Sequence, residues 1–373
     1  MRTRYSRHKL ALVCALTLVG LVCLMHGAVL AATPSAAPQS DVRIHAEPEH
    51  PMLPSGGAVE IKITATKKGT PLASAGLSAR LEGGTPGEVR LDDSGTAGYR
   101  FQATPEMETG VHAVEFREPA SGTVRKFYVD VVDQKTYDAF DETAKKIKPE
   151  ATPAHYLFIG DSLTDMFRGR NYVDKVDFWL WKIHGSQATV RNAGVGGDFI
   201  LRVWQRLNKD PSSYRLNMYD NLYEPLPTRV FFFLGHNDSK LTSRSEYKQP
   251  VVPLEEFEEK YRLAIRKIQA ETKARITVLS ATSSVYEITK ATSARRLAQG
   301  KANNLFGKPE ALEQFNAVAR KIAGQCGADY LDVYEPTRRH PDKQSLFTRD
   351  GVHVNNNGNR LLALEILKYL AGK

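Results

Sequence analysis

The sequence is poor in cysteine, with only Cys14, Cys23 and Cys326 among its 373 residues. The first two lie in an N-terminal segment that has the pattern of a removable leader, and neither follows the small residue that a bacterial lipid-attachment site requires. Cys326 is then the single thiol of the mature chain, so no internal disulfide can form and the fold depends on its hydrophobic core. We interpret Cys326 as a small buried apolar side chain.

Several familiar motifs are also absent, and each absence argues against a class of protein. No His-Glu-x-x-His or paired-cysteine spacing is present, which argues against a zinc site. The glycine-rich stretch 194–199 lacks the third glycine of a dinucleotide-binding fingerprint. No Gly-x-Ser-x-Gly sequence occurs, which argues against the α/β-hydrolase fold. Basic and aromatic residues do not interleave as on nucleic-acid-binding surfaces, so no nucleic-acid partner is expected.

The N-terminus has the three parts of a signal peptide over residues 1–31. A basic start precedes an apolar run over residues 10–25, and Val29-Leu30-Ala31 supplies small residues for cleavage. An uncleaved membrane anchor is the alternative, because the apolar run reaches spanning length if it is extended to Ala32. His26 and Gly27 interrupt that run, which favours cleavage and export to the periplasm or the medium.

The formal net charge of +9 is unevenly distributed. Residues 32–133 carry more acidic than basic side chains, whereas residues 134–373 carry a basic excess. A basic C-terminal part favours an anionic substrate or surface. Ordinary solubility charge is the alternative, since no run of five like charges occurs.

A chain of this length is expected to form two domains. After a Pro/Ala/Ser-rich linker at residues 32–40, residues 41–133 contain short alternating segments divided by glycine and proline turns, at 59–64, 99–103, 111–116 and 127–132. This pattern predicts a small all-β sandwich. Residues 92–99 resemble the turn and strand of bacterial immunoglobulin-like modules. No catalytic constellation lies here, so we interpret the domain as a spacer or a module that contacts a polysaccharide surface, separable from the rest of the chain.

Residues 134–153 are polar and lysine-rich, which predicts a second linker before a domain over residues 154–373. Apolar runs at 156–159, 229–234, 275–279 and 330–333 have the character of strands buried on both faces of a parallel sheet. Helical periodicity marks residues 254–271, 312–323 and 361–370. The alternation predicts an α/β fold, a three-layer α/β/α sandwich with a mainly parallel sheet.

Four short clusters of polar residues and glycine lie in the loops of this second domain. They supply a hydroxyl nucleophile, donors for an oxyanion, and a base with its own carboxylate, which are the parts required for acyl transfer through serine. In chain order the clusters are Gly160-Asp161-Ser162-Leu163, Asn192-Ala193-Gly194-Val195-Gly196-Gly197-Asp198, Gly235-His236-Asn237-Asp238 and Asp350-Gly351-Val352-His353.

The first cluster places Ser162 directly after a strand, where Gly160 permits a sharp turn. Leu163, Met166 and Phe167 share one face of the next segment, so we expect a helix whose N-terminus lies near Ser162 and favours negative charge there. The alternative is that Ser162 or Asp161 only caps this helix.

In the second cluster, the glycines permit a backbone path that directs the Gly197 N–H group into a cavity, although a plain turn is the alternative. In the third cluster, the Asn237 amide can donate to an oxyanion, and Asp238 is expected to fix the loop by accepting backbone N–H groups. His236 either lines the pocket or is an ordinary loop residue, and it is not assigned as the base.

In the fourth cluster, Asp350 and His353 lie three residues apart near the start of the last helix. On one turn, Asp350 can accept from Nδ1 of His353 and leave Nε2 facing Ser162. An isolated Asp-x-x-His sequence is otherwise a surface turn.

Taken together and in this order, the clusters resemble the blocks of the SGNH, or GDSL, hydrolase superfamily over residues 154–373. The resemblance implies that Ser162 is the nucleophile, His353 the base and Asp350 its orienting carboxylate. The implied oxyanion donors are the Ser162 N–H, the Gly197 N–H and the Asn237 side chain. Supporting roles fall to Asp161, Asp198, His236 and Asp238. No metal or organic cofactor is implied.

The resemblance leaves the ester open among lipids, thioesters, acetylated sugars and peptidoglycan, and export argues against cytosolic thioesters. Aromatic residues between the first and third clusters can stack on sugars, although core packing is their commoner role. The loop 239–253 carries Lys240, Arg244 and Lys248, which would favour an anionic glycan at the rim.

We therefore expect an O-acetylesterase that acts on polysaccharide. The alternatives are a lipase or lysophospholipase, a polysaccharide O-acetyltransferase, and a glycan-binding adhesion protein with a vestigial hydrolase. The aromatic residues are Trp179, Trp181, Trp204, Tyr214, Tyr219 and Tyr223.

Overall fold

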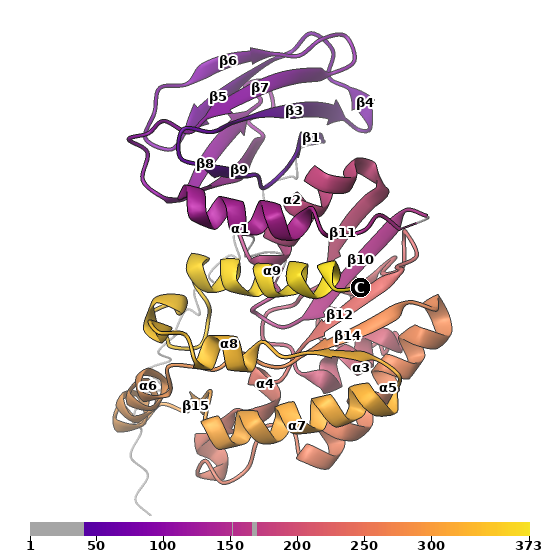
Figure 1. The fold of residues 1–373 in the computed structure, drawn as a ribbon, viewed down its shortest axis with the longest axis vertical. Coiled ribbons are helices and arrows are strands. Elements are labelled where there is room, and N and C mark those ends of the chain that lie inside the picture. The colour runs from indigo at the N-terminus through magenta and orange to yellow at the C-terminus, as the bar shows by residue number, and fades with distance from the viewer. Residues whose placement is uncertain (1–40, 151, 166–169) are drawn as a thin grey trace, which may run out of the picture. The chain divides into compact units, whose positions relative to one another are not determined.

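The computed structural model describes residues 41–150, 152–165 and 170–373 (Figure 1). The predicted signal peptide and the linker at 32–40 lie outside these ranges. None of the helices in the described ranges has the length and apolar character needed to cross a membrane.

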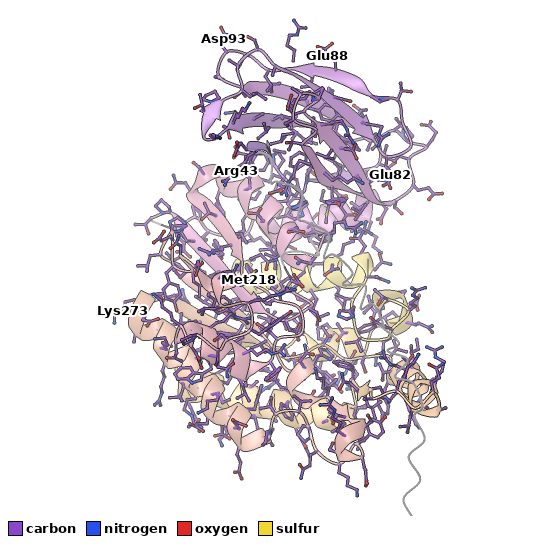
Figure 2. All side chains as sticks on the ribbon, turned by 180° about the vertical axis from the view of Figure 1, so that it is seen from behind. Arg43, Glu82, Glu88, Asp93, Met218 and Lys273 are labelled. Atoms are coloured by element: carbon purple, nitrogen blue, oxygen red, sulfur yellow. The ribbon has the colours of Figure 1, made fainter. Side chains whose placement is uncertain are left out.

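The N-terminal part is the predicted β-sandwich. Its inward-facing residues alternate along the strands, and Ile61, Ile63, Phe116 and Phe127 are fully buried between the two sheets. Outward positions are charged, as Figure 2 shows for Arg43 and for the other labelled residues of this part. One sheet contains β1 (Val42–Glu47), β3 (Ala58–Lys67), β4 (Thr70–Pro71) and β7 (Thr96–Gln102). The other contains β2 (Met52–Pro54), β9 (Val124–Val132), β8 (Gly110–Arg117), β5 (Gly76–Leu81) and β6 (Gly87–Arg90).

A five-stranded parallel sheet forms the centre of the C-terminal part, as predicted. Its strands are β10 (Ala154–Gly160), β11 (Ala188–Asn192), β12 (Arg229–Phe233), β14 (Arg275–Leu279) and β16 (Asp329–Leu331), in the spatial order β11-β10-β12-β14-β16. Along each apolar strand, successive side chains point alternately to the two faces of the sheet. Phe158 and Phe231 pack on one face, and Leu157 and Val230 pack on the other.

Helices cover both faces of this sheet and complete the three-layer sandwich (Figure 1). One layer contains α1 (Gln134–Ala144), α2 (Tyr172–His184) and α9 (Asn356–Ala371). The other contains α3 (Ile200–Leu207), α5 (Leu254–Thr272) and α7 (Pro309–Gln325). The other helices and strands of this part are α4 (His236–Ser239), β13 (Leu241–Thr242), α6 (Tyr286–Ala298), β15 (Asn304–Leu305) and α8 (Tyr334–Arg338).

Helix α1 lies inside the range 134–153 that the sequence pattern marked as a linker. Asp133 caps its start by accepting from the Thr136 N–H, and Phe140 and Ala144 are buried. The helix is polar on most of its surface, and only a narrow stripe at the spacing of Tyr137, Phe140 and Ala144 is apolar. Because the range is rich in lysine, the helical spacing of these three apolar residues was not recognised from the sequence.

The sandwich and the C-terminal part share buried contacts. Met52 and Val132 of the sandwich belong to the same apolar cluster as Phe140 and Trp179. Asp130 of β9 is buried and forms an ion pair with Lys175 of α2. Removal of residues 32–133 would expose this surface, so the structure favours loss of soluble protein over the separable module expected from the sequence.

Candidate active site

The first three polar clusters follow the carboxyl ends of adjacent parallel strands, β10, β11 and β12. Strand β10 lies between β11 and β12 although it precedes both in the chain, so the strand order reverses here. Ligands of open α/β sheets bind in the crevice at such a reversal. The fourth cluster lies on the turn immediately before α9.

The structure brings the three predicted nucleophile, base and carboxylate residues together. Oγ of Ser162 lies 2.9 Å from Nε2 of His353, and Nδ1 of His353 lies 2.6 Å from Oδ2 of Asp350. The Nδ1–H of the imidazole then donates to the carboxylate, which leaves Nε2 as an acceptor for the serine hydroxyl. The predicted arrangement of Ser162, His353 and Asp350 is therefore present in the geometry.

Local hydrogen bonds fix the turn that carries His353. Oδ1 of Asp350 accepts from the N–H groups of Val352 and His353 at 2.8 and 2.9 Å, and from Oγ1 of Thr348 at 2.9 Å. The side chain of Asn355 caps α9 just beyond the turn. Burial favours the neutral acid, but the hydrogen bonds from the His353 ring and the two N–H groups prevail and lower the pKa of Asp350. Asp350 is therefore held as a carboxylate beside the imidazole.

The three residues predicted to donate to an oxyanion, Ser162, Gly197 and Asn237, line one cavity. Gly197 has a φ of 81°, a left-handed conformation that glycine adopts without strain, and it lines the same cavity as Ser162 and Asn237. Within the described residues, the backbone N–H groups of Ser162 and Gly197 have no hydrogen-bond acceptor. Free N–H groups beside a nucleophile are the feature that stabilises a tetrahedral oxyanion.

Buried carboxylates connect the loops that carry these donors. Oδ1 of Asp161 accepts from the Leu163 N–H at 2.9 Å, and its Oδ2 accepts from Nδ2 of Asn237 at 3.2 Å. Burial raises the pKa of Asp161 to about 6. Asp198 is fully buried and forms an ion pair with Arg206 of α3. The four residues predicted to support the site therefore include two that hold neighbouring loops in place.

Asp238 and His236 complete the predicted supporting set. Oδ1 of Asp238 accepts from the Ile200 N–H at 2.8 Å, so this aspartate fixes the start of α3 as well as its own loop. Burial raises the pKa of Asp238 to about 7. His236 lines the cavity, and its Nε2 lies 2.9 Å from Oγ1 of Thr282. Burial, and next the charge of His353, lower the pKa of His236 to about 4, so its ring is neutral at physiological pH.

The helix expected directly after Ser162 is absent from the described residues of this segment. Residues 161–165 form turns and an isolated bridge between Asp165 and Gly194, and α2 begins only at Tyr172. Met166 and Phe167 lie outside the described residues. Oδ1 of Asp161 closes a local turn by accepting from the Leu163 N–H, and residues 162–164 form a turn and not a helix.

Two cavities flank the pair formed by Ser162 and His353. The first has a volume of about 440 Å³ and contains the oxyanion donors, and the second has a volume of about 350 Å³. Besides the predicted site residues and Leu163, the first is lined by Lys240, Thr289, Thr292, Arg296, Ala302, Asn303, Asn304, Phe306 and Val352. Besides Ser162, Leu163 and His353, the second is lined by Gly110, Val111, Arg170, Asn171, Val354, Asn355, Asn356 and Asn359.

For most of these additional lining residues, the sequence did not predict a place at the site. The α6–β15 region supplies one wall of the first cavity through a loop with no recognisable motif. Four asparagines lie within residues 355–359, two residues after His353. This concentration of amide side chains could have indicated a polar wall of the site. Of the three predicted rim cations, Lys240 lines the first cavity, whereas Lys248 is exposed and pairs with Glu246.

The predicted aromatic stacking surface is not formed at either cavity. Trp179 is fully buried against Phe140 and Phe178, and Tyr219 is buried beneath Arg206. The core-packing alternative therefore holds for these two rings. Phe306 is the aromatic residue that lines the cavity beside Ser162.

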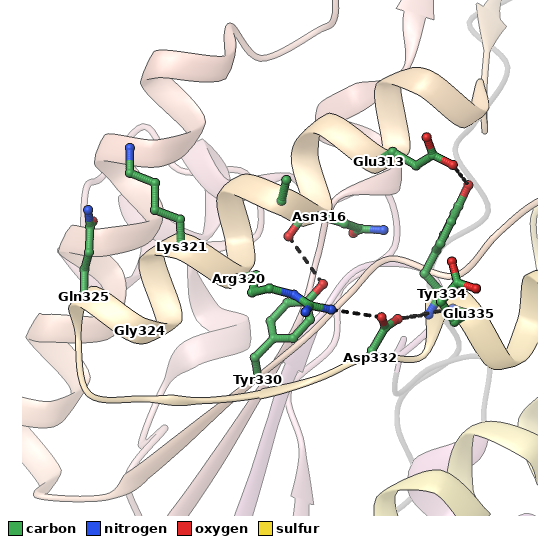
Figure 3. A pocket seen from close by; sticks show the side chains of 11 residues that line it. Glu313, Asn316, Arg320, Lys321, Gly324, Gln325, Tyr330, Asp332, Tyr334 and Glu335 are labelled. Carbon is green, nitrogen blue, oxygen red and sulfur yellow. Dashed lines mark hydrogen bonds and ion pairs between the residues drawn. The ribbon is translucent and has the colours of Figure 1, made fainter.

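A third cavity, of about 750 Å³, is larger than these two and lies between α7 and α8. Figure 3 shows its polar lining, in which Arg320 pairs with Asp332 and Tyr334 donates to Glu313. The face of Tyr330 is covered by the Arg320 guanidinium at 4.6 Å from the ring centre. No residue of the four clusters lines this cavity.

The comparison with protein families agrees with the site. A model described as the GDSL-like lipase/acylhydrolase family matches residues 158–361, a range that contains all four clusters. Because the match covers more than half of the chain, the chain belongs to this family of acylhydrolases. No curated protein matches the chain.

Two solved structures are similar to the chain at low identity. A lipase/acylhydrolase from Enterococcus faecalis is 22% identical, and the alignment covers 59% of this chain and 96% of that one with a TM-score of 0.44. A protein described as a GDSL-like lipase from Parabacteroides merdae is 17% identical, with 60% and 99% coverage and a TM-score of 0.44. These likenesses carry no argument about the substrate.

Proposed function

We propose that this chain is an exported serine esterase that hydrolyses O-acyl esters of a carbohydrate or cell-envelope polysaccharide, chiefly O-acetyl esters, through an acyl-serine intermediate. The observation that carries the proposal is the contact between Ser162 and His353, with Asp350 behind the imidazole. The N–H groups of Ser162 and Gly197, which have no acceptor among the described residues, add to it. These are the parts and the contacts that acyl transfer requires.

The contacts define the steps. Oγ of Ser162 attacks the ester carbonyl carbon while its proton passes to Nε2 of His353, and the carbonyl oxygen becomes an oxyanion held by Ser162, Gly197 and Asn237. The C–O bond to the alcohol breaks as His353 returns the proton to the leaving oxygen. Water then attacks the acyl carbon and loses a proton to Nε2 of His353. The bond between that carbon and Oγ breaks as His353 returns the proton to Ser162, and the free acid leaves. Asp350 keeps the imidazole in the required tautomer and stabilises its transient positive charge.

The cavity linings favour a small acyl group over a long one. Only Leu163, Ala302, Phe306 and Val352 among the residues that line the donor-containing cavity are apolar. A fatty-acyl chain requires a continuous apolar channel, because each methylene left in a polar setting forfeits about 0.8 kcal/mol. An acetyl group has no such requirement.

The second cavity favours a polyhydroxylated alcohol. Four asparagines, Asn171, Asn355, Asn356 and Asn359, line it. An amide side chain can both donate to and accept from a hydroxyl group. This lining suits an alcohol that carries several hydroxyl groups, such as a sugar. Gly110 and Val111 of the sandwich line this cavity as well, which supports a contact between the N-terminal domain and the polymer.

The test is acetate release from acetylated xylan, pectin, alginate and peptidoglycan, with Ser162→Ala as the matched control. We expect release from at least one polymer by the full-length mature chain and none by Ser162→Ala. Faster cleavage of p-nitrophenyl octanoate than of the acetate would indicate a lipase. Acetyl transfer to an added glycan in preference to water would indicate a transferase. Full activity of Ser162→Ala would refute the serine mechanism and favour a binding protein with a vestigial hydrolase.

Export is a separate part of the proposal. It rests on the basic and apolar pattern of residues 1–31. N-terminal sequencing of protein recovered outside the cytoplasm should begin at Ala32, and an intact N-terminus on membrane-bound protein would instead indicate an anchor.

A further inference from the structure

Lys240 occupies a distinctive place beside the donor-containing cavity. Its Nζ lies 3.0 Å from Oδ1 of Asn237, three residues earlier in the chain, and 5.3 Å from the centre of the Phe306 ring. It lines the same cavity as Ser162 and Gly197. The ammonium group is therefore directed at the amide of an oxyanion donor and not only toward solvent.

The contact determines which way the Asn237 amide faces. An ammonium group can only donate, so the atom that contacts Lys240 must be the amide oxygen. Nδ2 is then directed to Asp161, with 3.2 Å between Nδ2 and Oδ2. Since an amide nitrogen carries two hydrogens, one serves Asp161 and the other is available to an oxyanion.

Asp161 alone would not impose this orientation. Burial raises the pKa of Asp161 to about 6, so a proton on this carboxyl is accessible in weakly acidic conditions. A protonated Asp161 can donate to Oδ1 as readily as a carboxylate accepts from Nδ2. The amide would then be free to rotate by 180° and present its oxygen to the developing negative charge, which is repulsive.

Lys240 also strengthens the donor. A hydrogen bond to an amide oxygen polarises the amide and makes its N–H a better donor. The ammonium is partly withdrawn from water, where its charge is less screened than at the surface. Burial, and next the repulsion of Arg202, lower the pKa of Lys240 from its ordinary value.

We propose that Lys240 is a positioning residue of the oxyanion site: it holds the Asn237 amide with Nδ2 toward the cavity and polarises that amide. The proposal rests on the proposed serine esterase function. It assigns to Lys240 a role that acts through Asn237, distinct from the binding of an anionic substrate at the rim.

The test is a double-mutant cycle on p-nitrophenyl acetate, a neutral ester, with Lys240→Met and Asn237→Ala. We expect Lys240→Met to lower kcat on the order of 10-fold with little change in KM, a fraction of the 10²–10³-fold loss typical of removing a whole donor. Lys240→Arg, which retains a cationic donor, should recover part of the loss. In the Asn237→Ala background, Lys240→Met should have no further effect, because the group through which it acts is gone.

Lys248→Met is the matched control, because Lys248 belongs to the same loop but its side chain is 74% exposed and pairs with Glu246. It should leave kcat unchanged. Unaltered thermal unfolding of each variant separates this effect from a loss of folding. An equal kcat loss in both backgrounds would overturn the proposal, as would an increase in KM confined to anionic esters. Failure of the esterase function itself is distinguished by Ser162→Ala, which would then retain activity.

Discussion

The buried carboxylate of Asp130 offers a quantitative test of how the two parts of the chain are joined. Oδ2 of Asp130 accepts from Nζ of Lys175 at 2.6 Å and from Nε of Arg360 at 3.1 Å. Its Oδ1 accepts from Nη2 of Arg360 at 2.5 Å and from Nδ2 of Asn356 at 2.9 Å. Asp130 and Lys175 are each 4% exposed. This one residue of the sandwich thus accepts hydrogen bonds from three residues of α2 and α9.

The pKa shifts of Asp130 and Lys175 indicate that the two charges are compensated unequally. Burial opposes ionisation of Asp130, but Lys175 and Arg360 prevail and lower its pKa. Burial also lowers the pKa of Lys175, and there it outweighs the attraction of Asp130. Asp130 is therefore well compensated, whereas Lys175 depends on this one carboxylate. Asp130→Ala leaves the buried ammonium unpaired, and the expected loss in free energy of unfolding is about 3–5 kcal/mol.

Urea unfolding of residues 32–373 at pH 7 measures this loss in the free energy of unfolding. Lys175→Met should cost clearly less, because Asp130 keeps Arg360 and Asn356. Glu60→Ala is the control, since the Arg100–Glu60 pair is 64% and 63% exposed and is expected to contribute about 0–1 kcal/mol. A loss for Asp130→Ala no larger than that of the control would refute the reasoning, and so would an equal loss for Lys175→Met.

The pH dependence of the same variant has a defined sign. The folded pKa of Asp130 lies below its unfolded value of 3.8. The stabilisation by Asp130 is therefore fully present above that value and is lost as the pH falls through the lowered folded pKa. The stability difference between the unmodified chain and Asp130→Ala should be constant near neutrality and shrink in acid below about pH 4.

Three further predictions concern the site. Asp350→Asn should retain the fold but lower kcat by about 10³–10⁴-fold, because the imidazole loses the partner that fixes its tautomer, and near-normal kcat by steady-state assay would contradict the assignment. Asn359→Leu should raise KM for an acetylated oligosaccharide while leaving kcat/KM for p-nitrophenyl acetate unchanged; equal effects on both would exclude a sugar contact at this amide. Asp238 has a folded pKa raised to about 7, so its favourable contribution is complete below 3.8 and is lost as the pH rises through 7. Asp238→Asn should therefore be more stable than the unmodified chain at pH 8, on the order of 1 kcal/mol or more, and this advantage should disappear at pH 4 in thermal unfolding.

The layers of the fold could be predicted because each strand of the parallel sheet contains its own run of apolar residues. Residues 230–234 are apolar at every position, and residues 276–279 are apolar except for Thr277, a pattern that occurs when both faces are covered by helices. The period of residues 254–271 matched α5 closely, because one apolar stripe on a long helix determines which side is buried. Helix α1 escaped prediction because its apolar stripe is narrow and its other residues resemble a solvated linker.

The placement of the candidate site residues could be predicted to the extent that these residues lie in short clusters. Ser162, Gly197, Asn237, Asp350 and His353 each follow a strand or precede a helix, and the topology alone brings such positions to one edge of the sheet. The walls of the cavities were not predictable in this way. Phe306 reaches the site through a loop whose path depends on tertiary contacts, and such contacts leave no periodic trace in the sequence.

The supporting carboxylates show why the clusters act together and not as separate loops. Asp161, after β10, accepts from Asn237, after β12. Asp238, after β12, accepts from the Ile200 N–H at the start of α3, which follows β11. Each bond joins loops from two different strands, so displacement of one loop shifts the donors of another. Because an oxyanion donor displaced by about 1 Å loses much of its effect, these cross-strand bonds are the means by which the sheet transmits its rigidity to the reacting atoms.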